Sequence, residues 1–154
     1  LVKHFTGVRE VAGEPGFSSA ERLSIRPTFE IHGMPGGFTG AGKKSLIPSI
    51  ASAKISFRLV PNQHPEKIAR LTEAFLRKIA PPTVTVTCHR SGHSYPTLVD
   101  KDDVAVQAAD RAYQKSFGHP AIYFRAGGSL PIVHDITMSL GVPVAMIGFG
   151  LPDD

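Results

Sequence analysis

The chain has 154 residues, of which 42% are hydrophobic and 19% charged, so it has the composition of a globular protein with one domain or two small ones, not of a disordered chain. Its 17 basic and 13 acidic residues give a net charge of +4 that is spread along the sequence, which excludes a concentrated nucleic-acid-binding stripe. The single cysteine, Cys88, excludes an internal disulfide, and the sequence shows neither an apolar stretch of membrane-spanning length nor a signal-peptide pattern, so we expect a cytoplasmic protein.

The first half of the chain predicts a short helix followed by two strands. The helix lies in the first 26 residues, where Ser18 or Ser19 caps it and Pro27 closes it. Residues 27–34 predict a modest strand, and the glycine-rich residues 35–44 predict a loop. The clearest strand is 52–60, which alternates between an apolar face (Ala53, Ile55, Phe57, Leu59) and a polar face (Ser52, Lys54, Ser56, Arg58).

A helix and a third strand complete this part. Apolar residues recur with helical spacing from Pro65 to about Ile79, and residues 83–89, "TVTVTCH", alternate as a half-buried strand with Cys88 as a core residue. The order strand, strand, helix, strand, with one open polar sheet face, predicts an α+β domain in which helices pack on one side of an antiparallel sheet.

The second half has a different pattern. After a linker-like stretch at 90–103, the sequence predicts a helix over about 104–117, closed by Gly118, and a second helix that reaches Leu140 and is closed by Gly141. Two continuous apolar runs, 121–124 and 142–149, alternate with these helices. Such runs are typical of buried parallel strands in an α/β layer.

We therefore expect a lead-in segment at 1–26, a first domain at 27–96 and a partial α/β domain at 97–154. The chain begins with leucine and stops at "GFGLPDD", directly after an apolar run. We expect it to be a piece of a longer protein.

The stretch "FRAGGSLPIV", 124–133, is the strongest candidate for a binding site. Arg125 ends an apolar strand, Ser129 can cap the following helix, and Gly127 and Gly128 allow close approach to the backbone. Free amides at a helix N-terminus and an arginine at a strand end suit a carboxylate or phosphate. The alternative is an ordinary serine-capped helix whose glycines only form a turn.

Other motifs are weaker. Arg58 on a rigid strand is a suitable carboxylate clamp, although solvated strand arginines are common. "GAGKKSLIP", 40–48, lacks the spacing of a phosphate-binding loop. The seven histidines form no metal-binding motif, since His89 and His93 lie at a strand end and do not share a helical face.

Three stretches in order, "GGFTGAGKKSLIPSIASAKISFRLVPNQHPEKI" (36–68), "RAGGSLPI" (125–132) and "GFGLPDD" (148–154), resemble the di-zinc metallopeptidases. That family contains carnosinase-like dipeptidases, aminoacylase, glutamate carboxypeptidase, acetylornithine deacetylase and succinyl-diaminopimelate desuccinylase. The resemblance covers nearly all of 27–154, and the dipeptidase branch looks closest.

The resemblance implies that 27–96 is most of a ferredoxin-like lid and dimerisation domain, with antiparallel strands and helices on one face, and that 97–154 returns into the catalytic α/β domain. The family's two zinc ions are held by residues upstream of this chain and by a histidine after the "DD" motif. The resemblance thus predicts no catalytic and no metal-binding residues here, and a chain that is inactive by itself.

The resemblance implies substrate-binding roles for the residues that match the family's motifs: Ser45, Arg58, His89, Arg125, Gly127, Gly128 and Ser129. His93 is an alternative to His89, because the loop here is one residue longer. Ala126 replaces a residue that is often acidic in relatives, which puts substrate choice in doubt.

For the parent protein the resemblance implies zinc-dependent hydrolysis of the amide bond of a dipeptide or N-acyl amino acid, in a homodimer formed through the lid. This chain would contribute substrate-carboxylate binding and dimerisation. The alternative is a stand-alone ferredoxin-like module that binds a small carboxylate for regulation or assembly without catalysis.

Overall fold

The computed structural model describes residues 2–127 and 130–150. The chain divides into two compact units, Leu1–Arg58 and Leu59–Asp154, each of which is considered by itself. The domain boundaries expected after residues 26 and 96 remain predictions.

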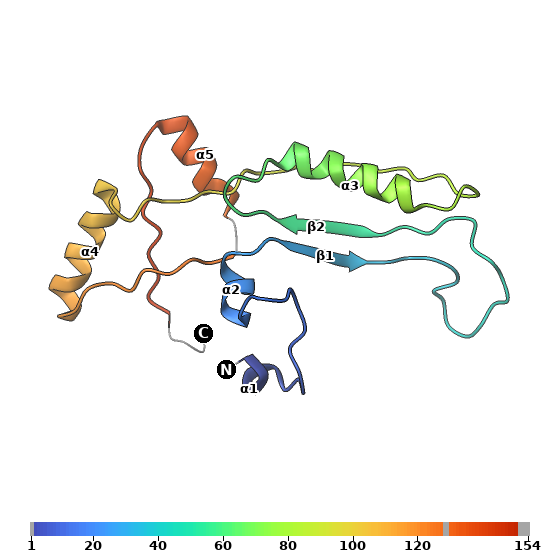
Figure 1. The fold of residues 1–154 in the computed structure, drawn as a ribbon, viewed down its shortest axis with the longest axis horizontal. Helices are drawn as coiled ribbons and strands as arrows, with labels where there is room; N and C mark the ends of the chain where they lie inside the picture. Colours follow the sequence, from blue (N-terminus) through green and yellow to red (C-terminus); the bar gives the residue numbers. More distant parts are fainter. Residues whose placement is uncertain (1, 128–129, 151–154) are drawn as a thin grey trace. The chain divides into compact units, whose positions relative to one another are not determined.

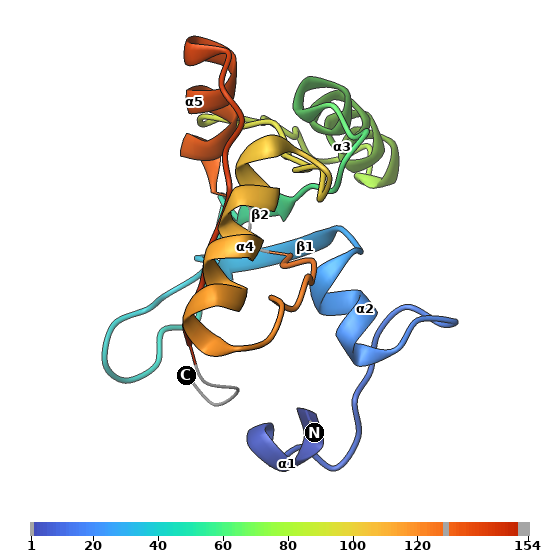
Figure 2. The ribbon, with the colours of Figure 1, turned by 90° about the vertical axis from the view of Figure 1, so that its left-hand side faces the viewer.

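The first unit contains two short helices and two strands. Helices α1 (Val2–Thr6) and α2 (Ser19–Ser24) precede strands β1 (Thr28–Gly33) and β2 (Lys54–Arg58). Ser18 is the N-cap of α2 and forms a reciprocal capping box: its hydroxyl accepts a hydrogen bond from the Glu21 amide at 3.3 Å, and the Glu21 carboxylate accepts one from the Ser18 amide at 2.7 Å. This cap fixes the start of α2, which lies directly before β1 (Figure 2).

Strands β1 and β2 form a two-stranded antiparallel sheet (Figure 1). Thr28 pairs with Arg58, and the register shifts between Ile31 and Gly33. The long loop 34–53 joins the strands and contains a single isolated bridge, between Gly36 and Ala51. The loop expected at 35–44 is therefore confirmed, and the strands at 27–34 and 52–60 are present with slightly shorter bounds.

The two faces of this sheet differ in chemistry, as the alternating sequence predicts. One face carries apolar residues in opposed pairs, Phe29 with Phe57 and Ile31 with Ile55, and the two phenylalanine rings lie 5.2 Å apart between centroids. Phe29 and Ile31 are nevertheless 55% and 52% exposed. The other face carries the polar and charged residues.

The second unit contains helices α3 (Pro65–Ile79), α4 (Val104–Phe117) and α5 (Pro131–Leu140), which confirms all three helices expected there. Asp103 caps α4 by accepting a hydrogen bond from the Ala105 amide at 2.9 Å, and Gly118 and Gly141 end α4 and α5 with φ of 78° and 63°. A left-handed conformation at these two positions favours glycine. The N-cap of α5 is Leu130, whereas the expected cap, Ser129, lies outside the described residues.

Three expected strands are not formed in the described part of the chain. Residues 83–89, 121–124 and 142–149 are irregular, because a strand needs a hydrogen-bonded neighbour and no other described segment pairs with them. The expected α+β class is confirmed. Its sheet has two strands among the described residues.

Few residues are buried. Within residues 2–127 and 130–150, only Pro65 and Val133 are buried, and Cys88 is half-buried, so the expectation that Cys88 is a core residue is wrong. The apolar stripe of α3 is also open, with Leu71, Phe75 and Ile79 each more than half exposed. The apolar residues of the sheet and of α3 could pack in a hydrophobic core, but in the described part of the chain they remain largely exposed.

None of the helices in the described part of the chain has the length and apolar character needed to cross a membrane.

Candidate functional site

The polar face of the β1–β2 sheet gathers five side chains that could bind a ligand. In an antiparallel pair, directly opposed residues project to the same side, and the register opposes Thr28 to Arg58 and Glu30 to Ser56. His32 continues the alternation of β1 on the same side, where its Nε2 lies 2.6 Å from the Ser56 hydroxyl oxygen. The sheet geometry alone therefore places these groups together.

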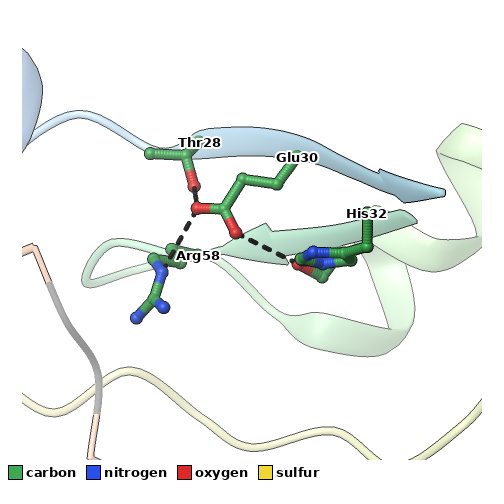
Figure 3. Close-up of polar contacts among 5 residues, drawn as sticks. Thr28, Glu30, His32 and Arg58 are labelled. Atoms are coloured by element: carbon green, nitrogen blue, oxygen red, sulfur yellow. Dashed lines mark hydrogen bonds and ion pairs between the residues drawn. The ribbon is translucent and has the colours of Figure 1, made fainter. Parts of the chain in front are cut away.

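Glu30 is the centre of this cluster. Its Oε1 accepts hydrogen bonds from the Thr28 hydroxyl at 2.9 Å and from Arg58 Nε at 3.2 Å, and its Oε2 accepts a longer one from the Ser56 hydroxyl at 3.4 Å (Figure 3). The 2.6 Å contact between His32 Nε2 and the Ser56 hydroxyl oxygen joins the imidazole ring to the same cluster.

These donors keep Glu30 ionised. The pKa of its carboxyl group lies below the usual value, first because of the Thr28 hydrogen bond and also because of the charge and hydrogen bond of Arg58, while partial desolvation opposes the shift. The site therefore carries a fixed negative charge next to Arg58 at neutral pH.

Arg58 remains accessible. Its side chain is 49% exposed, and Figure 3 shows its two terminal nitrogens pointing away from the Glu30 carboxylate. A guanidinium group has five N–H donors, and the bond to Glu30 uses only the one on Nε. The two terminal nitrogens of Arg58, which form the end of the forked guanidinium group, can therefore bind a second carboxylate.

The other predicted binding residues that the structure describes lie outside the β1–β2 sheet. Ser45 lies exposed in the 34–53 loop of the first unit, His89 and Arg125 are exposed in the second unit, and Gly127 is half-buried there. Gly128 and Ser129 lie outside the described residues. Among the described residues, no hydrogen bond joins two members of the predicted set within either unit, so their roles remain predictions.

A second polar cluster, in the second unit, surrounds Glu66 in the first turn of α3. The Tyr95 hydroxyl donates to both carboxylate oxygens, at 2.9 and 3.1 Å, and His93 Nε2 lies 2.9 Å from Oε1. The Tyr95 ring stacks on His134 of α5 with centroids 5.2 Å apart, and His64 meets its edge at 6.1 Å. Glu66 and Tyr95 thus connect the starts of two helices.

The segment that follows α3 runs back along it in the opposite direction (Figure 1). Arg77 donates to the Val86 carbonyl at 3.0 Å, and Glu73 pairs with Arg90 at 2.6 Å. Together with the contacts of Glu66, these bonds attach an extended segment to one side of the helix. The alternating residues 83–89 predict a strand that pairs with another strand. In the structure, side chains of α3 hold the segment that contains them instead.

Sequence reasoning missed Glu30, Glu66 and Tyr95. The position of Glu30 on the polar face could have been predicted, since Thr28, Glu30 and His32 alternate along β1 and project to the same side of the strand. The neighbouring strand β2 carries Arg58 on its own polar face. Glu66 and Tyr95 lie 29 residues apart in the sequence, and Tyr95 belongs to an irregular segment. No local sequence pattern therefore predicts their contact.

The described residues do not fit a metal centre. Within residues 2–127 and 130–150, no group of three or more histidine, cysteine, aspartate or glutamate side chains is arranged to hold a metal ion. The "DD" motif at residues 153 and 154 lies outside the described residues.

Comparison with known proteins identifies the type of domain. The family model for the peptidase dimerisation domain of the M20 peptidases matches residues 7–94. The chain is 30% identical over 135 residues to a Cys-Gly metallodipeptidase of Schizosaccharomyces pombe and 29% identical over 133 residues to the human Beta-Ala-His dipeptidase; each match covers 83% of this chain.

The fold agrees with these matches. An M20 family metallo-carboxypeptidase from Sulfolobus solfataricus superimposes with a TM-score of 0.75 and 30% identity over 92% of this chain and 36% of the carboxypeptidase. The chain spans only 28% and 26% of the length of the two dipeptidases.

The Glu66–Tyr95 contact predicts a specific dependence on pH. The pKa of Glu66 lies below its usual 4.5, first through a bond from its own amide and then through Tyr95, and the pKa of Tyr95 lies above its usual 10.0 because its hydroxyl donates to Glu66. The depressed Glu66 pKa stabilises the fold above about pH 4.5 and loses this effect as the pH falls through the folded-state value. The raised Tyr95 pKa stabilises it below about pH 10 and loses this effect as the pH rises through the folded-state value.

We expect Tyr95→Phe to raise the pKa of Glu66 toward 4.5 and to reduce the loss of stability between pH 5 and pH 3. NMR titration of the Glu66 carboxyl group and denaturant unfolding at both pH values measure these effects. Tyr123→Phe, at a tyrosine that is 49% exposed, is the matched control. An unchanged Glu66 pKa in Tyr95→Phe would contradict this assignment.

Proposed function

The chain belongs to the M20 peptidase family, whose dimerisation domain it carries at residues 7–94, and from this we propose that it binds the substrate carboxylate and forms the dimer interface of a metal-dependent dipeptidase. The relatives named as dipeptidases support hydrolysis of a dipeptide amide bond by the full-length protein. N-acyl amino acids are the other substrate class of this proposal, since they share a carboxylate next to an amide.

The observation that carries the proposal is the position of Arg58. Its guanidinium group stands on a strand whose register is fixed by pairing with β1, and its terminal nitrogens face away from the sheet's own carboxylate (Figure 3). A planar fork held by rigid backbone is well suited to a bidentate bond with a carboxylate.

The remaining predicted residues complete this proposal. Ser45 would add a hydroxyl donor from the 34–53 loop, and His89 a second polar contact. Arg125 and the backbone at Gly127, Gly128 and Ser129 would receive the carboxyl end of the substrate from the catalytic domain. Holding the carboxylate at these points would orient the scissile amide and exclude water when the lid closes.

The metal chemistry belongs to other parts of the protein in this proposal. The metallodipeptidase relatives support a metal ion, zinc by the resemblance, which would activate the attacking water. Since the described residues provide no metal site, no catalytic step is assigned to them. We further propose that this chain by itself is inactive.

The open apolar faces support an assembly role. Phe29 and Ile31 on the sheet, and Leu71 and Phe75 on α3, expose more than half of their side chains, which is unfavourable unless another surface covers them. We propose that residues 27–96 form a ferredoxin-like lid that pairs with a second copy in a homodimer, and that residues 97–154 belong to the catalytic domain. The single cysteine supports a cytoplasmic location for the protein.

Hydrolysis by the full-length protein tests the reaction class. We expect it to cleave dipeptides with a free carboxyl terminus, and we expect a chelator to abolish turnover and added zinc to restore it, because the activated water depends on the metal. Release of amino acids from a dipeptide panel measures this. Binding of small carboxylates without any hydrolysis would instead support a regulatory or assembly module.

Substitution of Arg58 tests the clamp. We expect Arg58→Ala to raise KM for a dipeptide by about tenfold to hundredfold with a smaller effect on kcat, because a charged hydrogen-bonded contact to the substrate is lost. Steady-state kinetics of the full-length protein measure the change. Lys54→Ala, on the same strand and the same polar face, is the matched control and should leave KM nearly unchanged. Equal KM values for the wild type and Arg58→Ala would refute the clamp.

A further inference from the structure

We propose that Glu30 is a positioning residue that sets how Arg58 receives a carboxylate and thereby the preference of the enzyme for substrates with a free carboxyl terminus. This inference rests on the proposed function of Arg58. It assigns to β1 a role in substrate selection beyond its place in the sheet.

A guanidinium group can bind a carboxylate in two ways. In a side-on pair the carboxylate bonds Nε and one terminal nitrogen, and in an end-on pair it bonds the two terminal nitrogens. Glu30 Oε1 lies 3.2 Å from Arg58 Nε and so occupies the side-on edge. Only the end of the fork, directed away from Glu30, is then open to a ligand (Figure 3).

Glu30 can do this because it is itself held at both oxygens. Thr28 donates to Oε1 at 2.9 Å, and Ser56 donates to Oε2 from the opposite strand at 3.4 Å. His32 in turn lies 2.6 Å from Ser56 and fixes that hydroxyl. A carboxylate anchored from two strands restricts the rotation of Arg58 more than a solvated one would.

The pairing also changes what the site selects. Glu30 offsets much of the positive charge of Arg58, so a ligand gains less from simple charge attraction. It gains more from two parallel hydrogen bonds, which a planar carboxylate accepts and a carboxamide, with one oxygen acceptor, does not. Selection therefore depends on the orientation of the fork as well as on its charge.

The test compares a dipeptide with its carboxyl-terminal amide on the full-length protein. The measured quantity is the ratio of kcat/KM for the free acid to kcat/KM for the amide. We expect Glu30→Ala to lower this ratio by about threefold to fivefold, mainly through KM for the free acid, and Glu30→Gln, which keeps a neutral acceptor, to lower it less. Thr28→Val, which removes one anchor of Glu30, should lower the ratio in the same direction.

Glu14→Ala is the matched control. It removes a partly exposed glutamate–arginine pair of the same kind, Glu14 with Arg26, with a contact of 2.7 Å, that involves neither Arg58 nor any other proposed binding residue. We expect it to leave the ratio unchanged, and thermal unfolding of each variant checks that the protein remains folded. If the amide is cleaved too slowly to measure, the inhibition constants of the released carboxyl-terminal amino acid and of its amide give an equivalent ratio.

The outcomes separate this inference from the proposed function. A ratio that collapses in Arg58→Ala but stays at the wild-type value in Glu30→Ala would overturn the positioning role and leave the clamp intact. An increased ratio in Glu30→Ala would show that Glu30 competes with the substrate, which also overturns it. A wild-type ratio in Arg58→Ala would instead refute the clamp itself.

Discussion

The antiparallel register between β1 and β2 is the constraint on which the rest of this account depends. By opposing Thr28 to Arg58 and Glu30 to Ser56, it puts two strands' polar side chains on one side of the sheet and Phe29 and Phe57 on the other. A shift of either strand by one residue would exchange the two faces and separate Glu30 from Arg58. The candidate binding face and the open apolar face thus have a common origin in the pairing.

Arginine and glutamate have complementary roles in this arrangement. Arg58 supplies the charge and the donors, while Glu30 supplies the direction in which those donors point. Because both side chains are partly exposed, the pair contributes little to folding stability. Its importance in this account lies in pre-organising a binding group before the substrate arrives, which lowers the ordering cost of binding.

Much of the fold could be predicted from local sequence. The helical periodicity from Pro65 to Ile79, the cap at Ser18 and the glycines at 118 and 141 depend on neighbouring residues, and the structure confirms them. The family resemblance is confirmed by the match at residues 7–94. The expected strand at 83–89 failed because strand formation depends on a distant neighbour, and here the side chains of α3 hold the extended segment instead. Arg58 is a candidate that the sequence alone suggests. The contacts of Glu30 could be found only once the register of the two strands was known, since the residues that it contacts on β2 lie 26 and 28 positions away.

A structure of the full-length protein with a non-hydrolysable dipeptide analogue tests the central claim most directly. We expect the carboxylate of the analogue to bond the two terminal nitrogens of Arg58 while Nε still donates to Glu30. A carboxylate bound side-on at Nε, with Glu30 turned away, would contradict it.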